Sequence, residues 1–198
     1  MPETQPCGVL LVGSAARGEA DRYSDLDLLL YYNSTPADER LAAARAKLGI
    51  GEHTEIFGRT EDGASETYRL DGVQCQLAHE SIAGVEREID RVVVDLDPTD
   101  EHMKILMGLE EGMPLHGEEV VAALQARARY TDELRRVLLE RSWKFFPLWY
   151  FEPRFAVRDA LLWRYDVLVD SAFRILRVLA LAPPLLRVKT APIVRGGD

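Results

Sequence analysis

Two short apolar segments near the N-terminus have the pattern of buried strands. Val9–Val12 is a continuous apolar run bounded by glycines, and Asp25–Tyr32 is a second run that contains two aspartates. Short apolar runs bounded by turn residues are typical of strands covered on both faces. Between the two runs we predict a tight loop that opens on Gly13 and Ser14, followed by a brief helical turn around residues 15–20.

The pattern beyond these runs extends the predicted sheet. Thr35–Gly49 has the cap, the acidic first turn and the periodicity of an amphipathic helix. Residues 53–57 are predicted to form a third strand, and residues 58–65 an exposed loop. The Asp71-Gly72 pair lies between two alternating segments, 67–70 and 73–78, and therefore predicts a β-hairpin.

The second half of the chain has mainly helical periodicity. After a predicted helix at 81–89 and a short strand or extended connection at 91–97, Pro98 marks a change in pattern. We expect an α+β fold, with an N-terminal mixed sheet flanked by helices and a C-terminal helical domain that resembles a bundle. The predicted domains are 1–98, 99–182 and an irregular tail, 183–198. Further helices are predicted at 101–109, 118–129, 131–143 and 158–181, with a loop at 114–117.

The two aspartates of the second run are the unusual feature of the chain. Asp25 and Asp27 point to the same face of a strand, while Leu26, Leu28 and Leu30 point to the other. Two like charges beside an apolar layer repel each other and are costly to desolvate. A divalent cation between them removes both costs, and Mg²⁺ commonly takes one or two carboxylates together with water and substrate phosphates.

Gly13 and Ser14 complete a candidate phosphate site. Glycine allows close backbone approach to a phosphate, and the serine can offer its hydroxyl and N–H groups to an anion. A glycine-serine pair after a strand also fits a simple turn with a helix cap. That reading leaves Asp27, inside an apolar strand, without an explanation. The combination therefore predicts a site for a nucleoside triphosphate and Mg²⁺.

These residues carry a resemblance to a known family. Gly13-Ser14, ten residues, and then Asp25-Leu26-Asp27 is similar to the GS-x10-DxD signature of the nucleotidyltransferase superfamily related to DNA polymerase β. That superfamily includes minimal nucleotidyltransferases and enzymes that adenylylate aminoglycosides and lincosamides. The resemblance implies that Gly13 and Ser14 hold the triphosphate and that Asp25 and Asp27 bind Mg²⁺ and are catalytic. It also makes Arg17 and Ser24 candidates for nucleotide binding.

The chain departs from the family pattern at a third position. Active members usually have a third carboxylate on a neighbouring strand, where this sequence has Gln76, or Gln74 in another register. Glutamine can orient a ligand but cannot accept a proton, and the loss of a general base costs about 10²–10⁴ in rate. Three nearby residues are candidates for a substitute base: Glu55, His79 and Glu80.

Composition and charge narrow the range of partners. With 33 acidic and 24 basic side chains the net charge is −9, which argues against nucleic acid and mildly favours a neutral or cationic small acceptor. The two cysteines, Cys7 and Cys75, suggest neither a disulfide framework nor a zinc site. We see no signal peptide and no membrane span, so a cytoplasmic location is expected.

Aromatic residues are concentrated in one segment, 143–165, which holds nine of the chain's sixteen. Such a segment is either core, or a homodimer contact, or a stacking surface for a base or an acceptor. Taken together, the sequence predicts an enzyme that moves AMP from ATP, or another nucleoside monophosphate from its triphosphate, onto a hydroxyl of a small molecule. The alternatives are a catalytically weakened nucleotide-binding or antitoxin-type protein, which Gln76 would permit, and a dimeric scaffold.

Overall fold

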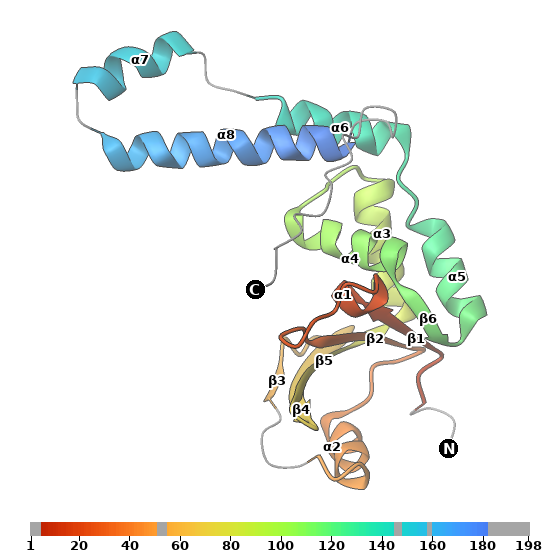
Figure 1. Ribbon diagram of the computed structural model, residues 1–198. Helices are drawn as coiled ribbons and strands as arrows, with labels where there is room; N and C mark the ends of the chain where they lie inside the picture. Colours follow the sequence, from red (N-terminus) through yellow and green to blue (C-terminus); the bar gives the residue numbers. More distant parts are fainter. Residues whose placement is uncertain (1–4, 51–54, 145–147, 158–159, 182–198) are drawn as a thin grey trace. The chain divides into compact units, whose positions relative to one another are not determined.

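A computed structural model describes residues 5–50, 55–144, 148–157 and 160–181 (Figure 1). The chain forms two compact units, Met1–Tyr130 and Thr131–Asp198, and each is described by itself. The boundary that we predicted near Pro98 falls inside the first unit, because the helices that follow it pack onto the sheet. The assignment of separate functions to residues 1–98 and 99–182 stays a prediction, and the tail at 183–198 lies outside the described residues.

The described part of the first unit contains a six-stranded mixed sheet with the order β3-β4-β5-β2-β1-β6. β2 runs parallel to β5, and the other neighbouring strands are antiparallel. This arrangement confirms the predicted α+β fold with its mixed sheet. The strands are β1 (Gly8–Val12), β2 (Leu26–Tyr32), β3 (Glu55–Phe57), β4 (Gly63–Leu70), β5 (Val73–Ser81) and β6 (Met113–His116).

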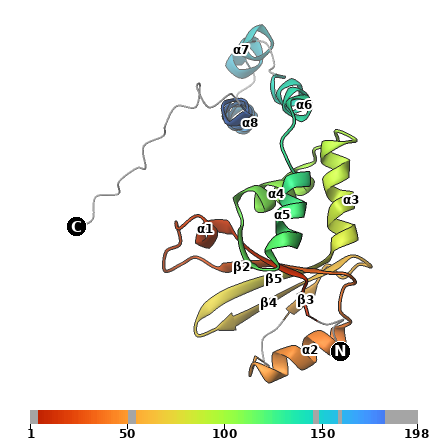
Figure 2. The ribbon, with the colours of Figure 1, turned by 90° about the vertical axis from the view of Figure 1, so that its right-hand side faces the viewer.

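Helices cover both faces of this sheet. Three of them, α3 (Ile82–Val93), α4 (Asp100–Glu111) and α5 (Glu118–Arg127), lie on one face, and α2 (Asp38–Lys47) lies on the other (Figure 2). Gly108 of α4 lies close to Val12 and Leu29, and Gly8 of β1 lies against Val121 of α5. The residues whose side chains point toward α3, α4 and α5 therefore include Val12, Leu29 and their strand neighbours. We call this side of the sheet the helical face.

Burial on the helical face builds most of the core. The fully buried side chains come from the strands and from all three helices. Burial of one such aliphatic side chain contributes roughly 1.5–3 kcal/mol, so these positions fix how the helices lie on the sheet. They are Leu10, Tyr31, Ile89, Val92, Leu106, Leu109 and Val121.

The Asp71-Gly72 hairpin is confirmed. Asp71 and Gly72 both have positive φ, at 50° and 84°, as the predicted tight turn requires. The two strands are longer than their alternation suggested, because β4 begins at Gly63 and β5 continues to Ser81. The prediction of a loop at 58–65 is therefore wrong for its last three residues. These residues form a strand by pairing with β5, which is distant in the sequence.

Two other segments differ from the prediction. Residues 91–97 were expected to form a short strand or an extended connection, but α3 continues through Val93, and Val92 in its last turn is fully buried. Tertiary burial overrides the weak helix propensity of the valines here. Residues 113–116 form β6 where a loop was expected at 114–117, and Pro114 is tolerated because β6 is an edge strand.

The second unit contains three described helices, α6 (Asp132–Ser142), α7 (Leu148–Val157) and α8 (Leu161–Leu181). Thr131 caps α6 by accepting a hydrogen bond of 3.1 Å from the N–H of Leu134. α6 packs against α8. No helix in the described segments is long and apolar enough to cross a membrane.

Part of the aromatic segment packs against itself. The rings of Phe151 and Phe155 are stacked with centroids 5.1 Å apart, and Trp163 contacts both of them edge-on. Phe151 is buried, which supports the core interpretation for this cluster. Trp143 and Trp149 are 69% and 73% exposed. A homodimer contact through residues 143–165 stays a prediction.

A buried polar network lies on the α2 face of the sheet. The Nδ1 atom of His79 is 2.9 Å from the hydroxyl of Tyr32, and its Nε2 atom is 2.8 Å from Oε1 of Glu66. The other carboxylate oxygen of Glu66 accepts a hydrogen bond from Arg45 of α2. Burial alone would raise the pKa of Glu66, but the hydrogen bonds and charges of His79 and Arg45 outweigh it and lower the pKa. The network therefore joins α2 to the sheet.

Replacement of Glu66 should destabilise the first unit strongly. We expect Glu66→Ala to reduce the free energy of unfolding at pH 7 by about 3–5 kcal/mol, because Arg45 then keeps a half-buried charge without its partner. A carboxyl with a lowered folded-state pKa contributes stability above its unfolded pKa and loses it as the pH falls through the folded-state pKa. Urea titrations from pH 7 to pH 3 should therefore show the difference from wild type shrinking below about pH 4.5.

The exposed Glu110 of α4 provides the control. Glu110→Ala should stay within about 0.5 kcal/mol of wild type across the same pH range. Equal losses in the two variants would contradict a specific role for the Glu66 network.

Candidate active site

The two aspartates meet on the helical face where β1 ends and β2 begins. Asp27 lies in β2 between Val12 of β1 and Gln76 of β5, and the three residues are register partners. Asp25 precedes the first residue of β2 and is two positions away on the same side. The structure therefore brings both carboxylates to one edge of the helical face, as the sequence predicts.

The electrostatics of this pair favour a bound cation. Burial raises the pKa of Asp27, and the nearby negative charge of Asp25 raises it further. In the described part of the chain neither carboxylate forms an ion pair, and the Asp27 carboxylate has no hydrogen-bond partner. No arginine neutralises the two charges there. The pair is thus electrostatically uncompensated within the described protein and suited to a divalent ion.

Gly13 shapes the space beside Asp27. Its φ is +72°, a conformation that favours glycine. A Cβ atom at this position would lie 2.7 Å from Oδ2 of Asp27, closer than real Cβ atoms approach. The first residue of the glycine-serine pair is therefore fixed both by backbone conformation and by the space that the Asp27 carboxylate needs. The turn at Gly13-Ser14 therefore lies close against the carboxylate of Asp27.

Substitution of Gly13 should damage the site more than the fold. Gly13→Ala must strain the backbone, at about 1–3 kcal/mol, and must also displace the Asp27 carboxylate. We expect it to weaken Mg²⁺-dependent ATP binding at least tenfold in calorimetric titrations. Gly18 is a matched control, because its φ is +69° but a Cβ there would meet nothing within 4 Å. Gly18→Ala should lose similar stability and keep its affinity, and equal affinity losses would contradict this role of Gly13.

Ser14 lies in α1 (Gly13–Ala16) and directly follows Gly13. This helix is shorter than the predicted turn at 15–20 and begins two residues earlier. It has no side-chain N-cap, because Val12 occupies the cap position. Contact between the Ser14 hydroxyl and a phosphate stays a prediction.

Arg17 and Ser24 are held by other protein groups. Arg17 forms ion pairs with Glu19 at 2.8 Å and with Glu111 of α4 at 3.0 Å, and these carboxylates raise its pKa. Ser24 takes part in a turn with Asp21, accepting a hydrogen bond of 2.9 Å from the Asp21 N–H. Both residues shape the loop between α1 and β2. Their contact with a nucleotide stays a prediction.

Gln76 occupies the place beside the aspartates where the resemblance leads one to expect a carboxylate. It pairs with Asp27 across β2 and β5, which selects Gln76 over Gln74 as the equivalent position. Its side-chain amide donates a hydrogen bond of 2.5 Å to Oδ2 of Asp25. Gln76 therefore orients Asp25 but offers no third negative charge.

Neither His79 nor Glu80, the two candidate bases whose side chains the structure describes, lies beside Asp25 and Asp27. His79 points to the α2 face and is enclosed in the network with Glu66. Glu80 lies on the helical face but is four residues from Gln76 along β5, about 13 Å at roughly 3.3 Å per residue. The side chain of Glu55 lies outside the described residues. Of the three candidates, His79 therefore lies on the face of the sheet opposite to Asp25 and Asp27.

A hollow opens on the helical face in front of Asp27. It has a volume of about 250 Å³, and its lining includes Asp27, Gln76, Phe57 and Ser65. Phe57 is 52% exposed and pairs with Ser65 across β3 and β4. The sequence analysis missed Phe57 and Ser65 as site residues, because their position depends on the register of β3 against β4. Phe57 provides an aromatic surface in this hollow, on a strand three positions away from β2 in the sheet.

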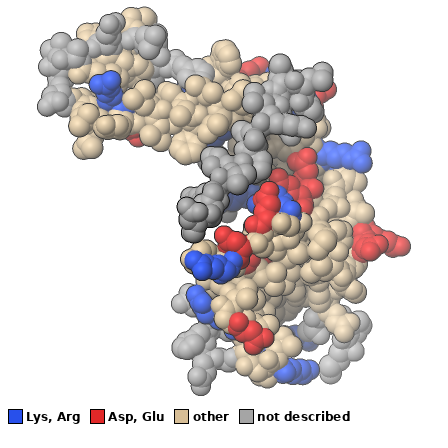
Figure 3. All heavy atoms as spheres, in the orientation of Figure 1, with Lys and Arg blue, Asp and Glu red and all other residues tan. Residues whose placement is uncertain are grey.

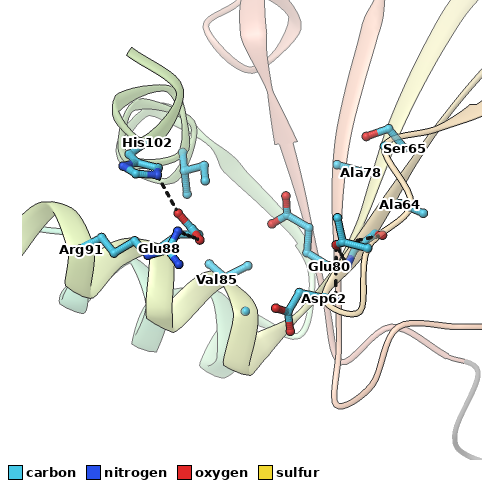
Figure 4. A pocket seen from close by; sticks show the side chains of 14 residues that line it. Asp62, Ala64, Ser65, Ala78, Glu80, Val85, Glu88, Arg91 and His102 are labelled. Atoms are coloured by element: carbon cyan, nitrogen blue, oxygen red, sulfur yellow. Dashed lines mark hydrogen bonds and ion pairs between the residues drawn. The ribbon is translucent and has the colours of Figure 1, made fainter. Parts of the chain in front are cut away.

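A second hollow of about 430 Å³ adjoins the first, because Ser65 and Ala78 line both. It lies between the sheet and helices α3 and α4 (Figure 4). Glu88 forms an ion pair there with Arg91 at 2.8 Å, and its carboxylate also lies 3.0 Å from Nε2 of His102. Burial, and to a lesser extent the charge of Glu88, raises the pKa of Glu80. The second hollow is therefore polar and partly acidic.

The donor set limits how a metal could bind. Among the described residues no group of three or more His, Cys, Asp or Glu side chains could hold a metal ion. A two-carboxylate site completed by water and phosphate oxygens fits Mg²⁺, which seldom takes an all-protein cage. The raised pKa of Asp27 and the space kept by Gly13 are the observations that fit such an ion.

Comparison with models of protein families identifies a domain in the N-terminal part of the chain. Residues 5–96 match the family model described as a nucleotidyltransferase domain. This span contains Gly13, Asp25, Asp27 and Gln76, and it ends shortly after α3. A search of curated proteins found no match.

Proposed function

Residues 5–96 match a nucleotidyltransferase domain, and from this match we propose a specific reaction. The protein moves a nucleoside monophosphate, in the simplest case AMP from ATP, onto a hydroxyl of a small molecule with the help of Mg²⁺. Nucleotidyl transfer in general follows from the domain. The nucleotide, the metal and the acceptor are our proposal, as is the cytoplasmic location that we expect.

One observation carries the proposal. Asp25 and Asp27 lie side by side without a neutralising cation from the described protein, next to a glycine whose missing Cβ leaves room for the Asp27 carboxylate. A purely structural pair of carboxylates would be expected to have arginine, lysine or several hydrogen-bond donors as partners. A ligand that brings both a divalent cation and phosphates satisfies this arrangement.

Each residue of the site has a defined task in this proposal. Asp25 and Asp27 hold Mg²⁺, and the bound ion offsets the negative charge of the phosphates. Gln76 keeps Asp25 in one orientation through its amide N–H. Gly13 lets the chain approach the triphosphate, and Ser14 offers its hydroxyl to a phosphate oxygen. The acceptor hydroxyl must then lie in line with the leaving pyrophosphate.

The two adjoining hollows are the proposed place for the acceptor. The hollow in front of Asp27 brings a bound molecule next to the aspartates, and Phe57 offers a flat apolar surface within it. The second hollow continues from Ser65 and Ala78 toward Glu80 and Glu88. Its acidic groups, and the net charge of −9, favour a neutral or cationic acceptor over a nucleic acid.

A second candidate is a nucleotide-binding protein with weakened catalysis, of the kind that acts as an antitoxin. The hydrogen bond from Gln76 to Asp25 favours it, because a stable carboxylate-amide contact replaces the third carboxylate. Loss of a general base would lower the rate by about 10²–10⁴ while two aspartates still bind the metal.

Pyrophosphate release separates these candidates. The full chain would be incubated with ATP, Mg²⁺ and a panel of hydroxyl-bearing amino sugars and lincosamides, beside the Asp25→Asn/Asp27→Asn double variant. Acceptor-dependent release by wild type alone supports the transferase. Absence of release across the panel, with ATP binding intact, favours the weakened binder, and a pull-down with the full chain then tests for a protein partner.

A further inference from the structure

The long helix α8 has one face without charges. Nine of its large apolar side chains are between 46% and 85% exposed. At 100° per residue they lie within an arc of about 160° on one side of the helix. They are Leu161, Leu162, Tyr165, Leu168, Val169, Phe173, Ile175, Leu176 and Leu179.

The remaining positions of α8 are arranged differently. Only alanines, Ala172 and Ala180, share the arc with the nine apolar side chains. Four positions are partly buried and repeat at the spacing of the opposite face: Val167, Ser171, Arg174 and Val178. The charged residues fall outside the apolar arc, and Arg174 forms an ion pair of 2.6 Å with Asp170. Figure 3 shows one view of this helix, in which uncharged surface predominates.

The size of this apolar face exceeds that of an ordinary surface patch. An aromatic side chain buries about 150–250 Å² when fully covered and an aliphatic one somewhat less, so nine half-exposed side chains present on the order of 800 Å². The largest apolar patch on a typical monomer is about 300–600 Å². A standard protein interface buries about 800 Å² per partner. The exposed face of α8 is thus as large as one side of a stable interface.

We propose that α8 pairs with α8 of a second copy of this chain through this face. A face without charges can meet itself about a two-fold axis, because no like charges come into contact. Homodimer interfaces are also more apolar than other interfaces, as this face is. Ala172 lies near the middle of the face and permits close approach of the two helices. The two α8 helices, each with the α6 helix that packs against it, then form a bundle-like arrangement.

A membrane surface is a less suitable occupant. Amphipathic helices that bind membranes are usually rich in Lys and Arg on the polar face. The polar side of α8 carries acids as well as arginines, among them Asp166 and Asp170, and the chain as a whole is acidic. The proposal concerns α8 alone and does not depend on the proposed enzymatic function.

The test is the mass of the full chain in solution. Sedimentation equilibrium at about 1–100 µM should give twice the monomer mass of 22.3 kDa for wild type. Leu168→Lys/Leu176→Lys places charges in the centre of the face and should shift the dissociation constant at least 100-fold, to monomer. Both leucines are more than half exposed in one chain, and lysine has similar helix propensity, so the variant should fold normally by circular dichroism.

Asp166→Lys is the matched control, because it changes the net charge by the same amount on the charged side of α8. It should remain a dimer. A wild-type monomer at about 100 µM would overturn the proposal, as would a dimer that both variants keep. If wild type is a monomer and floats with vesicles of phosphatidylglycerol and phosphatidylcholine, the face binds membranes instead. If wild type is a monomer and its α8 amides exchange more slowly than those of the lysine variant, another part of the same chain covers the face.

Discussion

In the Asp27→Asn variant, Mg²⁺ and ATP together should no longer stabilise the protein against heat. At a ligand concentration 100-fold above Kd, wild type should gain about 2.7 kcal/mol of stability. For a chain of this size that gain corresponds to a rise in Tm of roughly 5–11 °C. The variant should gain little, because an amide is a weak ligand for Mg²⁺ and leaves the site with one carboxylate.

Without ligand, Asp27→Asn should not lower the thermal stability of the protein and should even raise it. The Asp27 carboxylate is partly buried beside Asp25, and both conditions make its charged form unfavourable at neutral pH. The neutral amide of the variant removes that cost, so we expect the Tm of the free variant to be equal to or above that of wild type. Thermal denaturation of both proteins, with ATP and either Mg²⁺ or EDTA, measures the two effects. A variant destabilised without ligand would contradict the view that the pair is uncompensated.

The Gln76→Asp variant should gain activity. It restores a carboxylate next to Asp27 at the position that faces the same hollow. A group that can accept a proton there should raise the rate of pyrophosphate release by about 10²–10⁴. The rate would be measured with the acceptor found in the panel, or with water as acceptor. Without metal the third negative charge should also lower the Tm, because it adds repulsion to the site.

Gln74→Asp is the control for this gain. Gln74 lies on the same face of β5, two residues from Gln76 and paired with Arg69 of β4. A carboxylate there has the same charge but lies about 7 Å away along the strand. It should leave the rate within a few-fold of wild type. No gain from Gln76→Asp, or an equal gain from Gln74→Asp, would show that the third position does not limit the reaction.

Local signals in the sequence predicted the central part of the sheet. The apolar runs predicted β1 and β2, and the Asp-Gly turn predicted the hairpin of β4 and β5. The two aspartates were placed correctly because the period of a strand alone puts Asp25 and Asp27 on one face. In each case the signal is carried by residues close together in the chain.

Features that depend on distant contacts were not predictable in this way. β6 is a short edge strand that contains a proline, and only its pairing with β1 makes it a strand. α3 extends through Val93 and tertiary packing buries Val92, which the valine-rich sequence did not reveal. Phe57 and Ser65 join the site through the register of three strands. The extent of the first unit to Tyr130 likewise follows from packing of α4 and α5 on the sheet.

Binding of Mn²⁺ measured by electron paramagnetic resonance tests the central claim most directly. The signal of free Mn²⁺ is lost on binding, so a titration in the presence of a non-hydrolysable ATP analogue reports metal bound by the ternary complex. We predict binding to wild type beyond that of the analogue alone, and none beyond it for Asp25→Asn/Asp27→Asn. Equal Mn²⁺ binding by the two proteins would contradict the account, because the carboxylates would then not hold the metal.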